Sequence, residues 1–193
     1  MKNSDKGEVL TTLEIWRKYL NPLFEDKSYS SITADYSIVL NILEDDVNDA
    51  DPKKGRYVFL AKDNTYEIQS IASFHLTQHP GLPEKRALID ALVTAPWNYR
   101  WPVIKHPHPL RGGGLLLFFA ILLKAQKASL NYILLHATGT SFSFYEKIGM
   151  IQKGFNKFCL CLTPDSKEAS INALFEGRFG ESIKTKTLVL GLD

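Results

Sequence analysis

Two segments near the N-terminus place apolar residues at helical spacing. The first follows Thr11 and Thr12, either of which can cap it, and its apolar positions are Leu13, Ile15, Trp16, Tyr19, Leu20 and Leu23. The second begins at Ser31, and its apolar positions are Ile32, Tyr36, Val39, Leu40 and Leu43. A period near 3.6 residues predicts two amphipathic helices. The acidic and polar stretch 44–55 that follows predicts a turn-rich loop.

From residue 56 onward the pattern changes to that of strands. Residues 56–63 and 66–78 predict two strands joined by a turn at Asp63–Asn64, and residues 85–95 predict a third that Pro96 ends. Downstream elements are expected in alternation, in this order: a helix over 115–127, a strand over 131–138, a short helix over 141–149 closed by Gly149, a strand over 154–163, a helix over 165–177 capped by Asp165 or Ser166, and a strand over 182–192.

This order of elements predicts an α/β (α+β) domain. Strands with short links pair antiparallel, whereas the strand–helix–strand step at 85–138 predicts a parallel crossover. We therefore expect a single mixed, largely antiparallel sheet flanked by helices on both faces. The length of 193 residues favours one domain, 1–193, with an N-terminal helical part at 10–50, a core at 55–162 and a C-terminal helix and strand at 165–192.

Composition and charge narrow the class of partner. The net charge of +2 gives no reason to expect nucleic acid or an anionic membrane as a partner. The apolar run from Leu115 to Leu123 is too short to span a bilayer and predicts a helix buried on all sides. The N-terminus lacks the apolar segment of a secretory signal, and Cys159 and Cys161 are too close on one strand for a good disulfide. A reducing, cytoplasmic location fits best.

Three consecutive glycines stand between Arg111 and the predicted buried helix. Unpaired N–H groups at a helix start favour an anion, and glycines let a phosphate approach the backbone. A Walker A loop is excluded because no Gly-Lys-Ser/Thr follows, and the spacing of the Rossmann fingerprint is also absent. On these grounds a phosphate-binding turn and a plain linker are equally supported.

Residues further along the chain favour the first alternative. The run Arg111-Gly112-Gly113-Gly114, then a buried helix, the strand "YILLHAT" and the segment "FYEKIGM" at 144–150 resemble the GNAT superfamily of N-acetyltransferases. The resemblance implies the GNAT fold over about 55–162, with acetyl-CoA as co-substrate. It further implies that the strand ending near Thr94 splays from the next strand, so that free main-chain groups pair with the cofactor.

The resemblance also assigns candidate residues. It places the pyrophosphate of coenzyme A at a turn made of Arg111, Gly112, Gly113, Gly114, Leu115 and Leu116. It places the pantetheine arm along Leu92, Val93 and Thr94, and makes Tyr145 the residue that protonates the departing thiolate. The chain departs from the family pattern at Leu116, where a small residue is usual, and at Thr138, which replaces a common asparagine.

Acetyl transfer to an amine has three requirements: the ammonium must lose a proton, the carbonyl oxygen must be stabilised, and the departing thiolate needs a proton donor. A main-chain N–H near Val93 is a candidate for stabilising the carbonyl oxygen. Asp90, within an otherwise apolar strand, is the leading candidate for the base. His75, His136 and a water chain stay open as alternatives. Tyr145 is a candidate acid, and its other interpretation is a packing tyrosine.

Other side chains add little to the choice of chemistry. His106 and His108 are too few for a closed zinc site, so we expect no metal. The aromatic residues Trp97, Tyr99 and Trp101 either line a substrate mouth or anchor a loop. The acidic group 44–46 either attracts a cationic substrate or is solvated charge at a helix end.

The sequence therefore predicts an acyltransferase that moves an acetyl group from acetyl-CoA to a primary amine by direct transfer. The acceptor stays open among polyamines, antibiotics, amino acids and protein amines, and a homodimer is also left open. The alternative is a catalytically inactive module with the GNAT fold that binds acyl-CoA, a protein partner, or both. The departures at Leu116 and Thr138 motivate that alternative.

Overall fold

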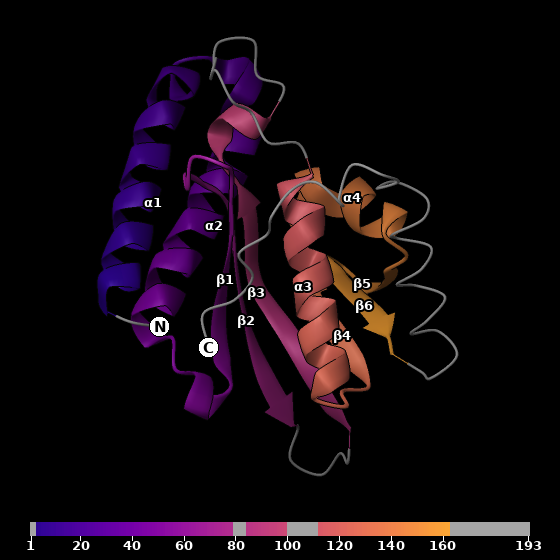
Figure 1. The fold of residues 1–193 in the computed structure, drawn as a ribbon. Coiled ribbons are helices and arrows are strands. Elements are labelled where there is room, and N and C mark those ends of the chain that lie inside the picture. The colour runs from indigo at the N-terminus through magenta and orange to yellow at the C-terminus, as the bar shows by residue number, and fades with distance from the viewer. Residues whose placement is uncertain (1–2, 79–83, 100–111, 163–193) are drawn as a thin grey trace.

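The computed structural model describes residues 3–78, 84–99 and 112–162 (Figure 1). The helices are α1 (Asn3–Phe24), α2 (Ser30–Asp49), α3 (Gly113–Lys127) and α4 (Phe142–Lys147), and the strands are β1 (Arg56–Lys62), β2 (Ile68–Gln78), β3 (Lys85–Thr94), β4 (Tyr132–His136), β5 (Ile151–Gly154) and β6 (Lys157–Cys161). Short 3-10 turns lie at Lys27–Tyr29, Pro52–Lys54, Pro96–Asn98 and Gly139–Ser141. Arg111, His106, His108, Trp101 and the C-terminal elements expected over 165–192 lie outside the described residues.

The two N-terminal helices are longer than the sequence pattern predicts. On α1 the buried stripe begins at Val9, before the predicted cap, so neither Thr11 nor Thr12 starts the helix, and the Thr12 hydroxyl instead donates to the Glu8 carbonyl. On α2 Val47 extends the buried stripe one turn past Leu43, and the helix therefore runs to Asp49. The prediction of a loop is wrong for residues 44–49 because a single buried valine keeps the helical face apolar.

Among the described residues the sheet has six strands in the order β1-β2-β3-β4-β6-β5. β3 and β4 are parallel, and the other neighbouring pairs are antiparallel. The mixed, largely antiparallel sheet and the crossover through α3 are thereby confirmed. The turn at Asp63–Asn64 also forms, because the Asp63 carboxylate accepts from the backbone N–H groups of Thr65 and Glu67.

The strand predicted over 154–163 forms only in part, because β6 covers 157–161 and a turn interrupts the range at 155–156. β5 and β6 form a hairpin that turns at Phe155 and Asn156, and Asn156 takes the left-handed backbone conformation with φ of 59°. Asparagine tolerates that conformation better than most residues, which is why a turn forms without a glycine at this position. Cys159 and Cys161 lie on β6 and are free thiols.

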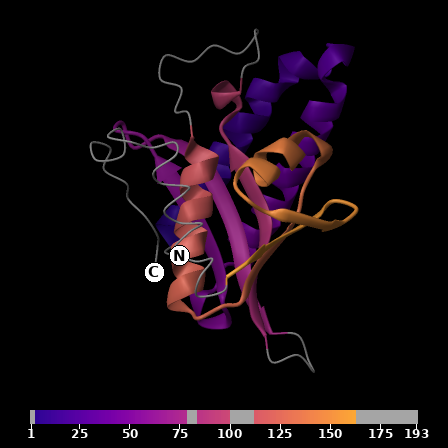
Figure 2. The same cartoon turned by 90° about the vertical axis from the view of Figure 1, so that its right-hand side faces the viewer.

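Helices cover the sheet on both faces (Figure 2). α1 and α2 pack on one face and α3 packs on the other, and each side has its own core of buried side chains. As predicted, most side chains of α3 are buried, including Leu117, Phe118 and Ile121 at 0% exposure. No helix within the described ranges combines the length and apolarity needed to cross a membrane.

A β-bulge at Asp90 changes which face of the sheet the side chains of β3 occupy. Ser73 pairs with Ala91 and Phe74 with Ile89, so Asp90 has no partner on β2. Before the bulge Ile89 belongs to the core beneath α3, whereas after it Val93 belongs to the core beneath α1 and α2. The extra residue reverses the alternation.

Candidate functional site

The parallel pair β3–β4 separates partway along its length. The last paired residues are Ile89 and Leu135, yet β3 continues from Asp90 to Thr94 without a partner on β4. The resemblance implies this split, and the structure has it. The main-chain groups of β3 that face the split are left without a strand partner there, which makes them available to an extended ligand.

The alternation of the strand decides which residues face the split. The Ala95 N–H donates to the Gln69 carbonyl on the β2 side, and successive residues of a strand point their N–H groups in opposite directions. The backbone of Val93 is therefore directed toward β2, and the backbones of Leu92 and Thr94 toward the split. The main-chain N–H groups that can donate to the carbonyl oxygen of a thioester in the split are therefore those of Leu92 and Thr94.

Tyr36 of α2 supports the free end of β3. Its buried hydroxyl donates to the Thr94 carbonyl at 2.5 Å, and burial raises the pKa of Tyr36 well above its ordinary value, so the phenol stays protonated. The Tyr99 ring packs on Tyr36 with centroids 5.6 Å apart. This hydrogen bond replaces part of the ladder that β3 loses on leaving β4.

We expect Tyr36→Phe to lower the free energy of unfolding by about 1–2 kcal/mol, because a buried carbonyl loses its donor. Urea unfolding followed by circular dichroism measures the change. Tyr19→Phe is the matched control, since Tyr19 is 37% exposed. Equal stability of both variants and the unmodified protein would contradict a bracing role for Tyr36.

The glycine turn opens α3 beside the split. Gly112 has φ of 86°, which favours glycine, and no side chain caps the helix. Because the first N–H groups of an α-helix have no partner within the helix, this end is suited to an anion. The helix continues with Leu115 and Leu116. Leu115 is buried, and Leu116 is partly buried and packs against the core beneath α3.

Packing against the sheet also explains two of the glycines. A Cβ on Gly113 would lie 2.1 Å from the Ser70 hydroxyl oxygen on β2, and a Cβ on Gly114 would lie 3.2 Å from Leu92 Cδ2. Both positions bring the start of α3 close to the strands. Phosphate access and a plain linker are the two explanations that the sequence supports, and close helix–sheet packing is a third that the structure adds.

Tyr145 of α4 is 5% exposed, and its ring packs between Phe144 and Phe158. Burial, with a smaller effect from the phenol of Tyr99, raises the pKa of Tyr145 far above its ordinary value. The group is therefore a protonated phenol at neutral pH, which is the form that donates. Core packing and an acid role are compatible in this geometry.

Thr138 lies in the turn between β4 and α4 and forms a local network. Its hydroxyl lies 3.3 Å from those of Thr140 and Ser141, and Thr140 donates to Asp35 of α2 at 3.1 Å. This contact ties the turn to the helix layer on the other side of the split. Nothing in the sequence indicated the Thr140–Asp35 contact, since 105 positions separate the two residues.

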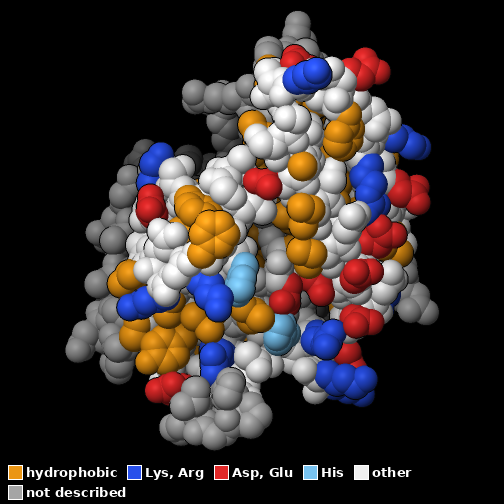
Figure 3. Space-filling view, turned by 180° about the vertical axis from the view of Figure 1, so that it is seen from behind, with side chains coloured by type: hydrophobic (Ala, Val, Ile, Leu, Met, Phe, Trp, Pro, Cys, Tyr) orange, Lys and Arg blue, Asp and Glu red, His pale blue; other side chains and the backbone are white. Residues whose placement is uncertain are grey.

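Asp90 and His75 come together on the face of the sheet opposite to α3. His75 Nδ1 lies 2.7 Å from Asp90 Oδ2, and the side chains are 33% and 23% exposed. Two of the alternatives for the base are thus one hydrogen-bonded pair. His136, the third, is exposed at the end of β4, just past Leu135. Histidine and acidic side chains gather in the middle of this face (Figure 3).

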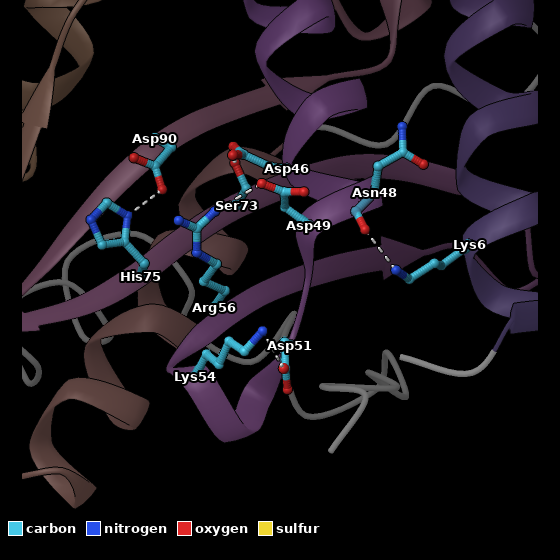
Figure 4. A network of polar contacts seen from close by, with 10 residues as sticks. All are labelled: Lys6, Asp46, Asn48, Asp49, Asp51, Lys54, Arg56, Ser73, His75 and Asp90. Atoms are coloured by element: carbon cyan, nitrogen blue, oxygen red, sulfur yellow. Dashed lines mark hydrogen bonds and ion pairs between the residues drawn. The ribbon is translucent and has the colours of Figure 1, made fainter.

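The acidic residues Glu44 and Asp46 have different partners in the structure. Glu44 pairs with Arg17 of α1, whereas Asp46 accepts a hydrogen bond from Ser73 at 2.5 Å (Figure 4). Desolvation raises the pKa of Asp46, and the Ser73 hydroxyl opposes that shift. Sequence reasoning missed Ser73 and Arg56, because neither has a distinctive neighbour in the chain.

The aromatic residues after β3 anchor a turn. Trp97 is buried, donates to the Gln69 side chain at 2.9 Å and contacts the ring of Trp16 edge-on. Tyr99 is 39% exposed beside Tyr36. Within the described residues no group of histidine, cysteine and carboxylate side chains is placed to hold a metal ion.

Comparison with known proteins supports the fold. Neither a protein-family model nor a curated protein matches the sequence. A GNAT family acetyltransferase from Brucella melitensis, solved in complex with acetyl-CoA, matches with a TM-score of 0.50 and 15% identity over 85% of this chain and 86% of that one. A putative acetyltransferase from Staphylococcus aureus Mu50 matches at 0.51 and 14% over 84% and 97%. A GNAT family acetyltransferase from the same organism matches at 0.50 and 13% over 84% and 96%.

The chain therefore has the fold of the GNAT acetyltransferases, as the resemblance predicts. A shared fold does not by itself specify an activity, which depends on the residues at the site.

Proposed function

We propose that the protein transfers an acetyl group from acetyl-CoA to a primary amine by direct transfer. The observation that carries the proposal is the split between β3 and β4 beside the uncapped start of α3. One part offers main-chain groups along an extended ligand, and the other offers unpaired N–H groups to an anion. Coenzyme A has both parts, an extended pantetheine arm and a diphosphate.

The residues of this chain would divide the binding as follows. The diphosphate would bind at the turn that begins with Arg111 and continues through Gly112, Gly113 and Gly114. Leu92 and Thr94 pair through their main chains with the pantetheine arm, while Val93 holds β3 to β2. Bound acetyl-CoA supplies a thioester whose carbonyl carbon an amine attacks.

Each chemical requirement has a candidate group. An N–H of Leu92 or Thr94 stabilises the carbonyl oxygen as negative charge develops on it. Tyr145, protonated and buried, gives its proton to the leaving sulfur as the carbon–sulfur bond breaks. Asp90 belongs to the group that removes the ammonium proton, on the face from which an acceptor reaches the split.

Binding of coenzyme A tests the proposal without knowledge of the acceptor. We expect calorimetry to show saturable binding of coenzyme A and a raised melting temperature in its presence. Pantetheine, which lacks the diphosphate, should bind at least tenfold more weakly, since the N-terminus of α3 then has no anion to hold.

Catalysis is tested separately with acetyl-CoA and a panel of spermidine, free lysine, a lysine peptide and an aminoglycoside. Release of the thiol with formation of an N-acetyl product supports the transfer. Absence of coenzyme A binding would overturn the whole proposal. Binding without acetylation of any amine would favour the inactive, ligand-binding module instead.

A further inference from the structure

A cavity of about 220 Å³ lies on the face of the sheet opposite to α3. Its lining residues are Asp46, Arg56, Tyr57, Ser73, Phe74, His75 and Asp90. The cavity is open to solvent and large enough for the end of an amine-bearing molecule. The polar contacts around it are drawn in Figure 4.

The contact between His75 and Asp90 fixes the state of the imidazole. An ionised carboxylate only accepts hydrogen bonds, so the 2.7 Å contact requires a proton on His75 Nδ1. In the neutral ring Nε2 then carries a lone pair and accepts a proton. Figure 4 shows this second nitrogen turned away from Asp46 and Ser73.

The other charges facing the cavity favour a cation in it. Asp46 from α2 and Asp90 from β3 each present a carboxylate, and among the described residues the hydrogen bond that Asp46 accepts comes from the neutral hydroxyl of Ser73. Arg56 from β1 is engaged by Asp49 at 3.1 Å. Asp90 lies directly against the imidazole, so an ammonium group that approaches His75 meets a negative charge beside the ring.

The cavity adjoins the split. Asp90 is the bulged residue of β3 and directly follows Ile89, the last residue paired with β4. The bulge puts this carboxylate where the free main chain of β3 begins. A molecule in the cavity thus approaches the split from the face opposite to α3.

Resting on the acetyl transfer proposed above, we propose that His75 takes the proton from the acceptor ammonium and that Asp90 is its positioning residue. The nitrogen–hydrogen bond breaks, the electron pair stays on the amine nitrogen, and the proton goes to His75 Nε2. The imidazolium later returns this proton to solvent. The acceptor is accordingly an amine that arrives as a cation.

The tautomer of His75 gives a readout that needs no substrate. Nitrogen NMR of ¹⁵N-histidine-labelled protein, with His75→Gln used to assign the signals, should show His75 protonated at Nδ1 in the neutral ring. Asp90→Ala should shift the population toward protonation at Nε2, the form that an unassisted imidazole prefers. Asp46→Asn should leave the tautomer unchanged. A neutral His75 protonated at Nε2 in the unmodified protein would overturn the inference.

Kinetics supply the second arm, with the amine from the panel that reacts best. His75→Gln should lower kcat/KM at least tenfold at neutral pH and remove the acidic limb of its pH profile, while affinity for acetyl-CoA is kept. His136→Gln, which changes the exposed histidine on β4, is the matched control. If the unmodified protein acetylates no amine, the proposed function fails and this role fails with it. If it does acetylate an amine but His75→Gln keeps both rate and profile, only the present inference fails.

Discussion

We expect Tyr145→Phe to lower kcat for acetylation of an amine about 100-fold and to leave the affinity for acetyl-CoA unchanged. The size of the effect is that of general acid catalysis, in which a positioned donor contributes a factor of about 100 or more. The phenol carries its proton at neutral pH, because burial raises the pKa of Tyr145 further above that range. Phenylalanine keeps the ring packing against Phe144 and Phe158 and removes only the donor.

Steady-state kinetics at several pH values and calorimetry with acetyl-CoA measure the two quantities. Tyr66→Phe is a matched control, since Tyr66 is 72% exposed in the turn between β1 and β2. A variant with a normal melting temperature and an unchanged kcat would show that Tyr145 only packs. In that case another donor, or solvent, protonates the thiolate.

Most of the architecture is predictable from the sequence, because in most elements the local residue pattern favours the same conformation that the fold requires. Alternating residues in β3, the apolar run of α3 and the left-handed Gly149 after α4 each specify one conformation. The errors occur where the local pattern is ambiguous. The end of α2 depends on the single residue Val47, and the turn between β5 and β6 depends on Asn156.

The candidate site is predictable only in part, because its contacts depend on register. Asp90 and His75 were separate alternatives in the sequence, and the antiparallel pairing of β2 with β3, together with the bulge, makes them one pair. No periodicity in a single sequence reveals a bulge that adds one residue to a strand. Asp46 likewise reaches Ser73 only because α2 crosses this part of the sheet.

The glycine turn shows how one residue type can satisfy two requirements. The sequence offered access for a phosphate as one explanation, and this requires free backbone at the start of α3. The structure shows that the missing Cβ atoms of Gly113 and Gly114 face β2 and β3. Close packing brings the helix start to the split, where its N–H groups can serve an anion. Stability and binding therefore have to be measured on the same variants.

Gly113→Ala should lower the free energy of unfolding by about 2 kcal/mol, because overpacking at a close contact forces neighbouring groups to move. The added Cβ would lie 2.1 Å from Ser70 Oγ and 3.2 Å from Ser70 Cβ. Ser70 is fully buried, and its hydroxyl donates to the Gln69 carbonyl at 2.7 Å. Either the hydroxyl rotates and loses this hydrogen bond, or α3 moves away from the sheet.

A double-mutant cycle separates this clash from the general cost of changing a glycine. Ser70→Ala removes the clashing oxygen, so the variant with both changes should be more stable than the sum of the single effects implies. Gly7→Ala, at an exposed position of α1 with open space around it, should instead gain about 0.5–1 kcal/mol. Urea unfolding measures all four variants, and additivity of the two single effects would contradict the packing explanation. If the double variant also keeps its affinity for coenzyme A, the glycine at 113 serves contact with the sheet, and the diphosphate needs only the N–H groups of the helix start.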